Sequence, residues 1–173
     1  ARSIGQSNRL LTLDVSGGGQ TTINDILDVQ AADLRNATLL GSNTHLRSGQ
    51  FTFHQTLDSG TGGPYTLDTL SVSTLSLLGA VGGNSRLQSI DGLGALQTVL
   101  GSNVTAQDFV RFGATRLEGD STVKSFAGPI DFGVITSPIA RNLGVDTPGI
   151  ATFGGTIGTL ANPLASINRF GGG

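Results

Sequence analysis

The chain has 173 residues, of which 27 are glycine and only 13% are charged, and its net charge is −2. It contains one glutamate, one lysine and no methionine, so it lacks the residues that usually cover helix surfaces, and a helical bundle or coiled coil is excluded. A hydrophobic content of 37% argues against disorder, and ten scattered basic residues argue against electrostatic binding to nucleic acid.

Short segments of alternating apolar and polar residues predict β-strands along the chain. The clearest of them are residues 11–15, 51–53, 70–72 and 130–132. Clusters of Gly, Asn, Asp and Ser predict turns at residues 16–19, 41–43, 58–64, 82–85 and 101–103. No apolar run approaches the roughly 18 residues of a transmembrane helix, so we expect no membrane span.

The segment from Ile23 to Leu34 is ambiguous by itself, because its apolar residues recur at close to helical spacing. Residues 100–105, which lie 77 positions after the start of this segment, contain glycine, asparagine and β-branched residues instead. Two copies of one repeat unit should share a backbone conformation. We therefore interpret Ile23–Leu34 as strand–turn–strand.

An internal repeat underlies that comparison, because a shift of 77 residues aligns the chain with itself. The shift superposes identical residues, among them Leu10 on Leu87, Asp14 on Asp91 and Ala37 on Ala114. It predicts tandem units at about residues 1–77, 78–154 and, in part, 155–173. Because no capping repeat is evident and the chain starts at Ala1 without an initiator methionine, we expect a processed chain or a piece of a longer array.

Short strands, variable turns and a long repeat together predict an all-β fold, a right-handed parallel β-solenoid in which residues 1–173 form one elongated segment. Each turn would contain roughly 20 to 25 residues and stack on the next at about 4.8 Å. We expect Leu10, Leu13, Leu40 and Leu46 to be buried, each aligned along the axis with its partner 77 residues on. The alternative, a sandwich of Ig-like repeats, predicts regular hairpin turns, but only Asp91-Gly92 is clear.

Two stretches resemble the repeat regions of very large secreted bacterial adhesins of the filamentous-haemagglutinin type. They are Thr147–Gly158, with the following Pro163–Ile167, and Gly113–Leu117 ahead of Ile130–Gly133. The resemblance covers most of residues 98–173. It implies a right-handed β-helix that serves surface attachment or forms a fibrous stalk, and it contributes no catalytic residues.

β-Helix enzymes that cleave polysaccharides need clustered carboxylates on neighbouring turns. The densest charged group consists of Asp108, Arg111, Arg116, Glu118 and Asp120. Such a group is more often a solvated face with loose ion pairs than a catalytic site.

Asp14, Asp91 and Asn168 form a possible carboxylate row under the 77-residue shift. The asparagine removes the acid from the third position, and turn capping explains aspartate and asparagine equally well. We therefore predict no catalytic residue.

Metal and cofactor sites are not indicated either. His45 and His54 stand far from any acid cluster in the sequence, so surface or turn placement is expected rather than metal binding. Residues 17–19 and 171–173 are Gly-Gly-Gly runs without the Lys-Ser/Thr of a phosphate loop. Two glycosylation triplets, at Asn36 and Asn103, are of a kind that is frequent by chance in a chain of this composition.

These patterns predict a structural or adhesive segment of a secreted, cell-surface bacterial fibre or stalk, and not an enzyme. The expected partners are flanking repeats or sister copies, which could also assemble end to end, with surface glycans as a further candidate. A fragment of a carbohydrate-active β-helix enzyme is the alternative. Persistent core leucines, exposed charges that change from unit to unit, and a single small length change favour the stalk.

Overall fold

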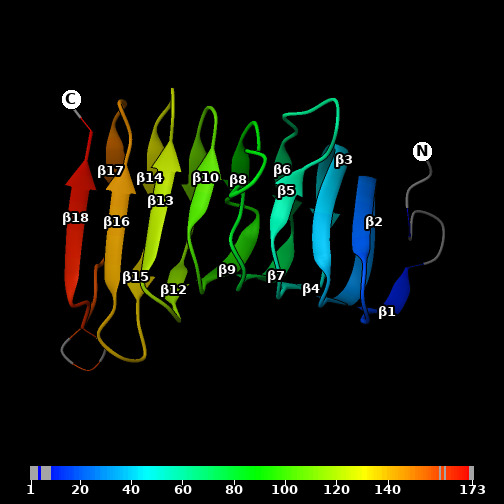
Figure 1. Cartoon of the computed structure of the whole chain (residues 1–173). Coiled ribbons are helices and arrows are strands. Elements are labelled where there is room, and N and C mark those ends of the chain that lie inside the picture. Colours follow the sequence, from blue (N-terminus) through cyan, green and yellow to red (C-terminus); the bar gives the residue numbers. More distant parts are fainter. Residues whose placement is uncertain (1–3, 5–8, 160, 162, 172–173) are drawn as a thin grey trace.

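The computed structural model describes residue 4 and residues 9–159, 161 and 163–171. These residues form parallel β-strands and no helix, and they wind into a β-solenoid of about eight turns (Figure 1). The all-β solenoid predicted from the sequence is thereby confirmed, whereas its right-handed sense stays a prediction. No helix long and apolar enough to cross a membrane occurs among the described residues.

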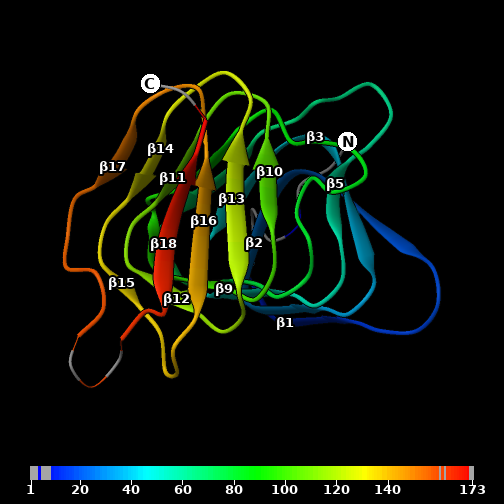
Figure 2. The ribbon, with the colours of Figure 1, turned by 60° about the vertical axis from the view of Figure 1, so that its left-hand side comes forward.

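Each turn contributes to three faces that surround one hydrophobic core (Figure 2). The first face contains the start of β2 (Gln20–Leu34), the start of β3 (Ala37–Arg47), β5 (Leu57–Ser59), β10 (Val104–Ala106), β13 (Ser121–Ser125), β16 (Asn142–Asp146) and β18 (Ser166–Phe170). The second contains the middle of β2, the end of β3, β6 (Leu67–Leu70), β8 (Ile90–Gly92), β11 (Val110–Phe112), β14 (Ile130–Phe132) and β17 (Ala151–Phe153). The third contains β1 (Leu10–Val15), the end of β2, β4 (Gln50–Phe53), β7 (Val72–Leu77), β9 (Ala95–Leu100), β12 (Thr115–Leu117) and β15 (Ile135–Thr136).

The segment Ile23–Leu34 is strand, as the repeat comparison predicted. It lies within β2, which runs over all three faces because its start, middle and end pair with different strands. The expected turn is a corner in this strand: the register shifts between Ile23 and Asp25, and Asp25 has φ of 65°. A non-glycine residue with positive φ bends the chain without ending the strand.

Inward-facing side chains form columns along the axis, because residues on one face alternate between core and solvent. On the third face one column consists of Leu34, Phe53, Leu77, Leu100 and Leu117, all 0% or 1% exposed. On the second face Phe112, Phe132 and Phe153 stack with ring centroids 6.0 and 5.8 Å apart. Burial of this continuous core is the main stabilising contribution to the fold.

Two glycines show how closely the turns approach one another. A Cβ at Gly79 would lie 2.0 Å from the Gln55 carbonyl oxygen, and a Cβ at Gly94 would lie 1.9 Å from that of Thr69. Both contacts are with the backbone of the preceding turn. Glycine is therefore required at these positions by space, which explains part of the high glycine content.

The strand pairing contradicts the predicted alignment of residues 77 positions apart. Leu13 lies on the third face and Ile90 on the second, and Leu40, Leu46 and Leu10 likewise lie in different columns from their partners. Paired residues on neighbouring turns are 17 (Gln20 with Ala37) to 24 (Asn142 with Ser166) apart in sequence. Because turns differ in length, one fixed shift does not keep a residue on its face.

The burial predictions are confirmed for Leu40 and Leu46, and also for the expected core residues Leu87 and Ile90. They fail at the N-terminal end, where Leu10 is 41% exposed and Leu13 is only half-buried.

Two expected boundaries are also wrong. The segment 70–72 is the corner between β6 and β7, where Ser71 has φ of 59°, and the expected turn at 41–43 lies inside β3.

Candidate functional site

A row of polar side chains runs along the second face, parallel to the solenoid axis. Strand pairing places five residues directly next to one another on β3, β6, β8, β11 and β14, namely His45, Asp68, Asp91, Arg111 and Asp131. We call these five residues the polar row. They point outward because their strand neighbours Leu46, Leu67 and Ile90 point into the core, and each is partly exposed.

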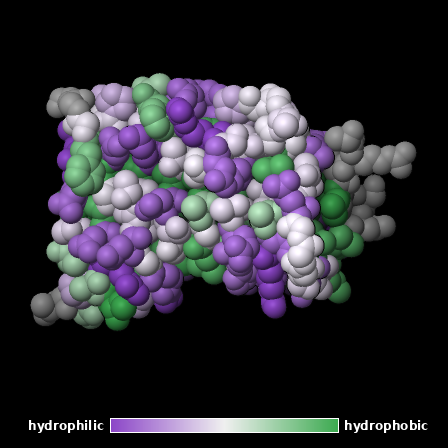
Figure 3. Space-filling view, viewed as in Figure 1, coloured by the Kyte–Doolittle hydropathy of each residue, from purple (hydrophilic) through white to green (hydrophobic). Residues whose placement is uncertain are grey.

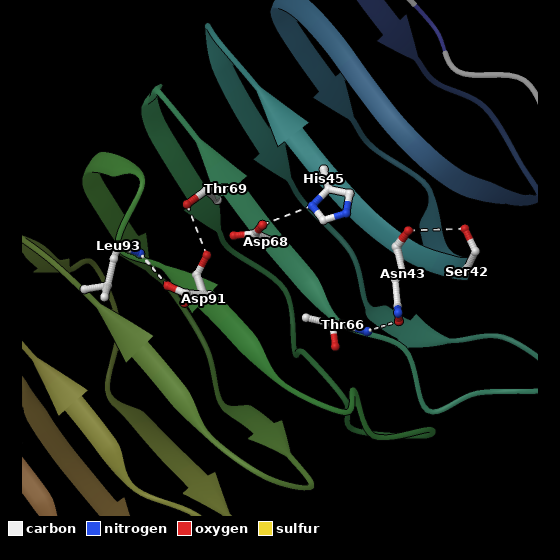
Figure 4. Close-up of polar contacts among 8 residues, drawn as sticks. All are labelled: Ser42, Asn43, His45, Thr66, Asp68, Thr69, Asp91 and Leu93. Atoms are coloured by element: carbon white, nitrogen blue, oxygen red, sulfur yellow. Dashed lines mark hydrogen bonds and ion pairs between the residues drawn. The ribbon is translucent and has the colours of Figure 1, made fainter.

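Charge alternates along most of the polar row. His45 Nδ1 lies 3.0 Å from Asp68 Oδ2, and Arg111 lies 3.9 Å from Asp91 Oδ2 and 3.4 Å from Asp131 Oδ2. The carboxylates of Asp68 and Asp91, in contrast, occupy directly opposed positions on neighbouring strands (Figure 4). Opposed like charges are destabilising by themselves, and here each is offset by a cationic or neutral partner on its other side.

Hydrogen bonds to the backbone fix the acidic part of the row. Asp91 Oδ1 accepts a hydrogen bond from the Leu93 N–H at 3.2 Å, and the Thr69 hydroxyl donates to the Asp91 carbonyl at 3.1 Å (Figure 4). The Thr66 N–H donates to Asn43 Oδ1 at 3.0 Å near the opposite end of β6. Loops adjoining β6 and β8 are thereby tied to the turns beside them, which orients the two carboxylates.

The polar row can accept and donate hydrogen bonds over several turns at a spacing of about 4.8 Å. It is not a metal centre: among the described residues no group of three or more His, Cys, Asp or Glu side chains is arranged to hold a metal ion. The absence of metal binding expected for His45 and His54 therefore agrees with the geometry of the described part of the chain.

The dense charged group predicted from the sequence is not brought together. Asp108 accepts a hydrogen bond from the Gln88 side chain, and Arg116 pairs with Glu118 on the third face. Asp120 accepts from the Asn142 N–H at 2.9 Å and from its side chain at 3.0 Å. These bonds, the backbone one first, hold the pKa of Asp120 below its usual value. Only Arg111 belongs to the polar row.

The carboxylate row predicted from Asp14, Asp91 and Asn168 does not exist, because the three residues lie on the third, second and first faces respectively. All three lie within strands. Asp91 also has the turn-capping bond to Leu93 that the sequence suggested. Its carboxylate neighbour is Asp68, which no shift of 77 residues could have revealed.

Both histidines have an acidic partner from a neighbouring turn, contrary to the expectation from linear distance. His54 Nε2 lies 2.7 Å from Asp33 Oδ1. A hydrogen bond from Arg35 is the largest of the influences that lower the pKa of Asp33; the charges of Arg35 and His54 act in the same direction, and partial burial opposes them.

The other sequence motifs have structural surroundings. Gly17 and Gly19 have φ of 109° and 125° in the turn between β1 and β2, and Gly171 has φ of 94° after β18. Gly172 and Gly173 lie outside the described residues. Of the two glycosylation triplets, Asn103 uses its side-chain oxygen to accept from the Thr122 N–H at 2.8 Å, and Asn36 is half-buried.

A second polar cluster lies on the first face around Phe126, which is 41% exposed. The guanidinium of Arg86 lies 3.9 Å from the centre of the Phe126 ring and the ammonium of Lys124 lies 4.8 Å from it. Lys124 also pairs with Asp146 on the next turn. The ring is therefore covered by cations, and its surroundings are those of a surface ion-pair network.

The sequence did not indicate the polar row, because its members are separated by 23, 23, 20 and 20 residues. A signal exists in retrospect, since each member is the central residue of an apolar–polar–apolar or similar triplet of a short strand. Comparison with protein-family models, with curated proteins and with solved structures finds no match.

Proposed function

We propose that the chain is a structural and adhesive segment of an extracellular bacterial fibre or stalk. The observation that carries the proposal is the uninterrupted stack: about eight parallel turns of 17 to 24 residues follow one another on one continuous core. In such a stack each turn contacts only its neighbours, so length can grow without redesign of the core. Backbone hydrogen bonds along the axis share a load applied to the ends.

The resemblance of residues 147–158 to adhesin repeats supports the same proposal. So does the surface, on which hydrophobic groups are small and interleaved with hydrophilic ones on the face seen in Figure 3. A surface of this kind suits many weak contacts with a long polar ligand, and such contacts add up when they repeat along an axis. The polar row is the part of this surface that we assign to glycans.

The stalk role is tested by immunogold electron microscopy of the producing cells, with antibodies raised against residues 1–173. We expect label along thin projections outside the cell. Label confined to the cell interior, or on compact particles, would contradict the proposal.

The adhesive role is tested separately, by binding of the purified chain to immobilised neutral and acidic polysaccharides. Asp68→Asn and Asp91→Asn should weaken binding to the preferred glycan, since they remove hydrogen-bond acceptor strength from the polar row. Asp146→Asn on the first face is the matched control and should bind like the unchanged chain. Equal loss in all three variants would sink the assignment of glycan binding to the polar row.

One observation favours a second candidate, a carbohydrate-cleaving enzyme: Asp68 and Asp91 are carboxylates on adjacent strands, as general acid–base chemistry requires. Against it, Asp68 pairs with His45 and Asp91 with Arg111, the arrangement of a surface ion-pair ladder. We expect no release of reducing ends from any polysaccharide that the chain binds. Turnover that Asp68→Asn or Asp91→Asn abolishes would establish the enzyme instead.

A further inference from the structure

The first face has an arginine where its core column should continue. Strand pairing builds one inward column from Val81, Val104, Val123 and Val145, and the next residue in that column is Arg169 of β18. The four valines are 0% or 1% exposed. Arg169 is exposed, because β18 pairs only with β16 among the described strands.

The side chain of Arg169 lies over the end of the core and is held there. One guanidinium nitrogen donates to the Gly149 carbonyl at 3.0 Å, across to the loop that follows β16. Its neighbours in the strand divide as the pleat requires: Ile167 packs against the core, while Asn168 faces solvent. The charge therefore occupies an inward position, which is a device that protects sheet edges from pairing with another strand.

The opposite edge of the same face is the start of β2. The column of valines continues in that direction through Leu57 and Thr38 to Thr21. If a second copy stacked its first turn on β18 and continued the face, its Thr21 would stand opposite Arg169. The segment 20–24 contains no carboxylate. The arginine would be buried without a counter-ion, which is strongly unfavourable.

We propose that Arg169 closes the β18 edge to a second copy of this chain. The inference is independent of the adhesive role, and for this edge it replaces the expectation of end-to-end assembly. A strand that pairs with β18 has to offer a carboxylate opposite Arg169 and an apolar side chain opposite Ile167.

The test is sedimentation velocity of the 173-residue chain over a wide range of concentration. Arg169→Val and the milder Arg169→Thr should associate at least about tenfold more tightly than the unchanged chain, because the charge no longer has to be buried. Arg169→Lys keeps the charge and Asn168→Val alters the outward neighbour, so both should behave like the unchanged chain. A folded Arg169→Thr or Arg169→Val chain that associates no more tightly would overturn the proposal, as would equal association of Asn168→Val.

A charge introduced from the other side tests the same geometry without altering β18. Thr21→Asp places a carboxylate opposite Arg169 in the head-to-tail arrangement and should promote association of an otherwise unchanged chain. The same substitution combined with Arg169→Val should lose that gain, since the aspartate then meets an apolar position. An equal effect of Thr21→Asp with and without Arg169 would refute the head-to-tail pairing.

Discussion

The first turns and the middle turns of the solenoid follow the same path with different strand lengths and different burial. β2 has 15 residues and β3 has 11, and each passes from one face to the next without a break. From β8 to β14 the strands have three to six residues and are separated by turns at the corners.

Burial follows position in the stack and not residue type. Leu10 in β1 is 41% exposed, whereas Leu77 in β7 is fully buried, although both are leucines on the third face. A middle turn is covered on both sides, and the first turn is covered by described residues on one side only. The comparison shows that a column position becomes core only when a turn lies on each side of it.

The largest expected effect is a truncation in the middle of the stack. Leu77→Ala should lower the free energy of unfolding by about 2 to 5 kcal/mol, because it leaves a cavity between Phe53 and Leu100. Leu10→Ala, the matched change in the first turn, should cost less than about 1 kcal/mol. Urea unfolding followed by circular dichroism measures both. Similar losses at the two sites would contradict the dependence of burial on position.

A glycine pair sharpens the comparison at the level of the backbone. Gly79→Ala should destabilise by about 1 to 3 kcal/mol or more, since the added Cβ would lie 2.0 Å from the Gln55 carbonyl oxygen. Gly18→Ala is the control in the turn after β1, where an added Cβ has nothing within 4 Å. It should leave stability unchanged or slightly higher. A Gly79→Ala chain with an unchanged melting temperature would show that neighbouring turns can separate.

The smallest expected effect is the pH dependence contributed by Asp33 on the third face. Its pKa is lowered, chiefly by the hydrogen bond from Arg35, below the ordinary value of 3.8. A lowered carboxyl pKa stabilises the folded chain above the ordinary value, and the contribution is lost as the pH falls through the lowered one. Asp33→Asn should therefore reduce the melting temperature slightly at neutral pH and have no effect at strongly acidic pH.

The Arg35→Gln background is the control for that measurement. Without the hydrogen bond from Arg35, the effect of Asp33→Asn on the melting temperature at neutral pH should shrink. An effect that persists at acidic pH, or that does not depend on Arg35, would mean that Asp33 acts by packing and not by charge.

The sequence by itself determined the class of fold. Few helix-forming residues, alternating strands and frequent glycine exclude helices and predict a solenoid, because these features act within a few residues. It also determined most of the middle core, including Leu87 and Ile90, since apolar residues in short alternating strands have one side on which to be buried.

Only the tertiary structure decided which residues meet across turns. The pairs His45–Asp68, Asp91–Arg111 and Asp33–His54 depend on the number of residues in each intervening turn. That number varies because corners such as Asp25 and Ser71 need no fixed length, so a single long repeat could not place Asp91 beside Asp68. The same cause put Arg169 in a column of valines: its place depends on the length of every turn before it.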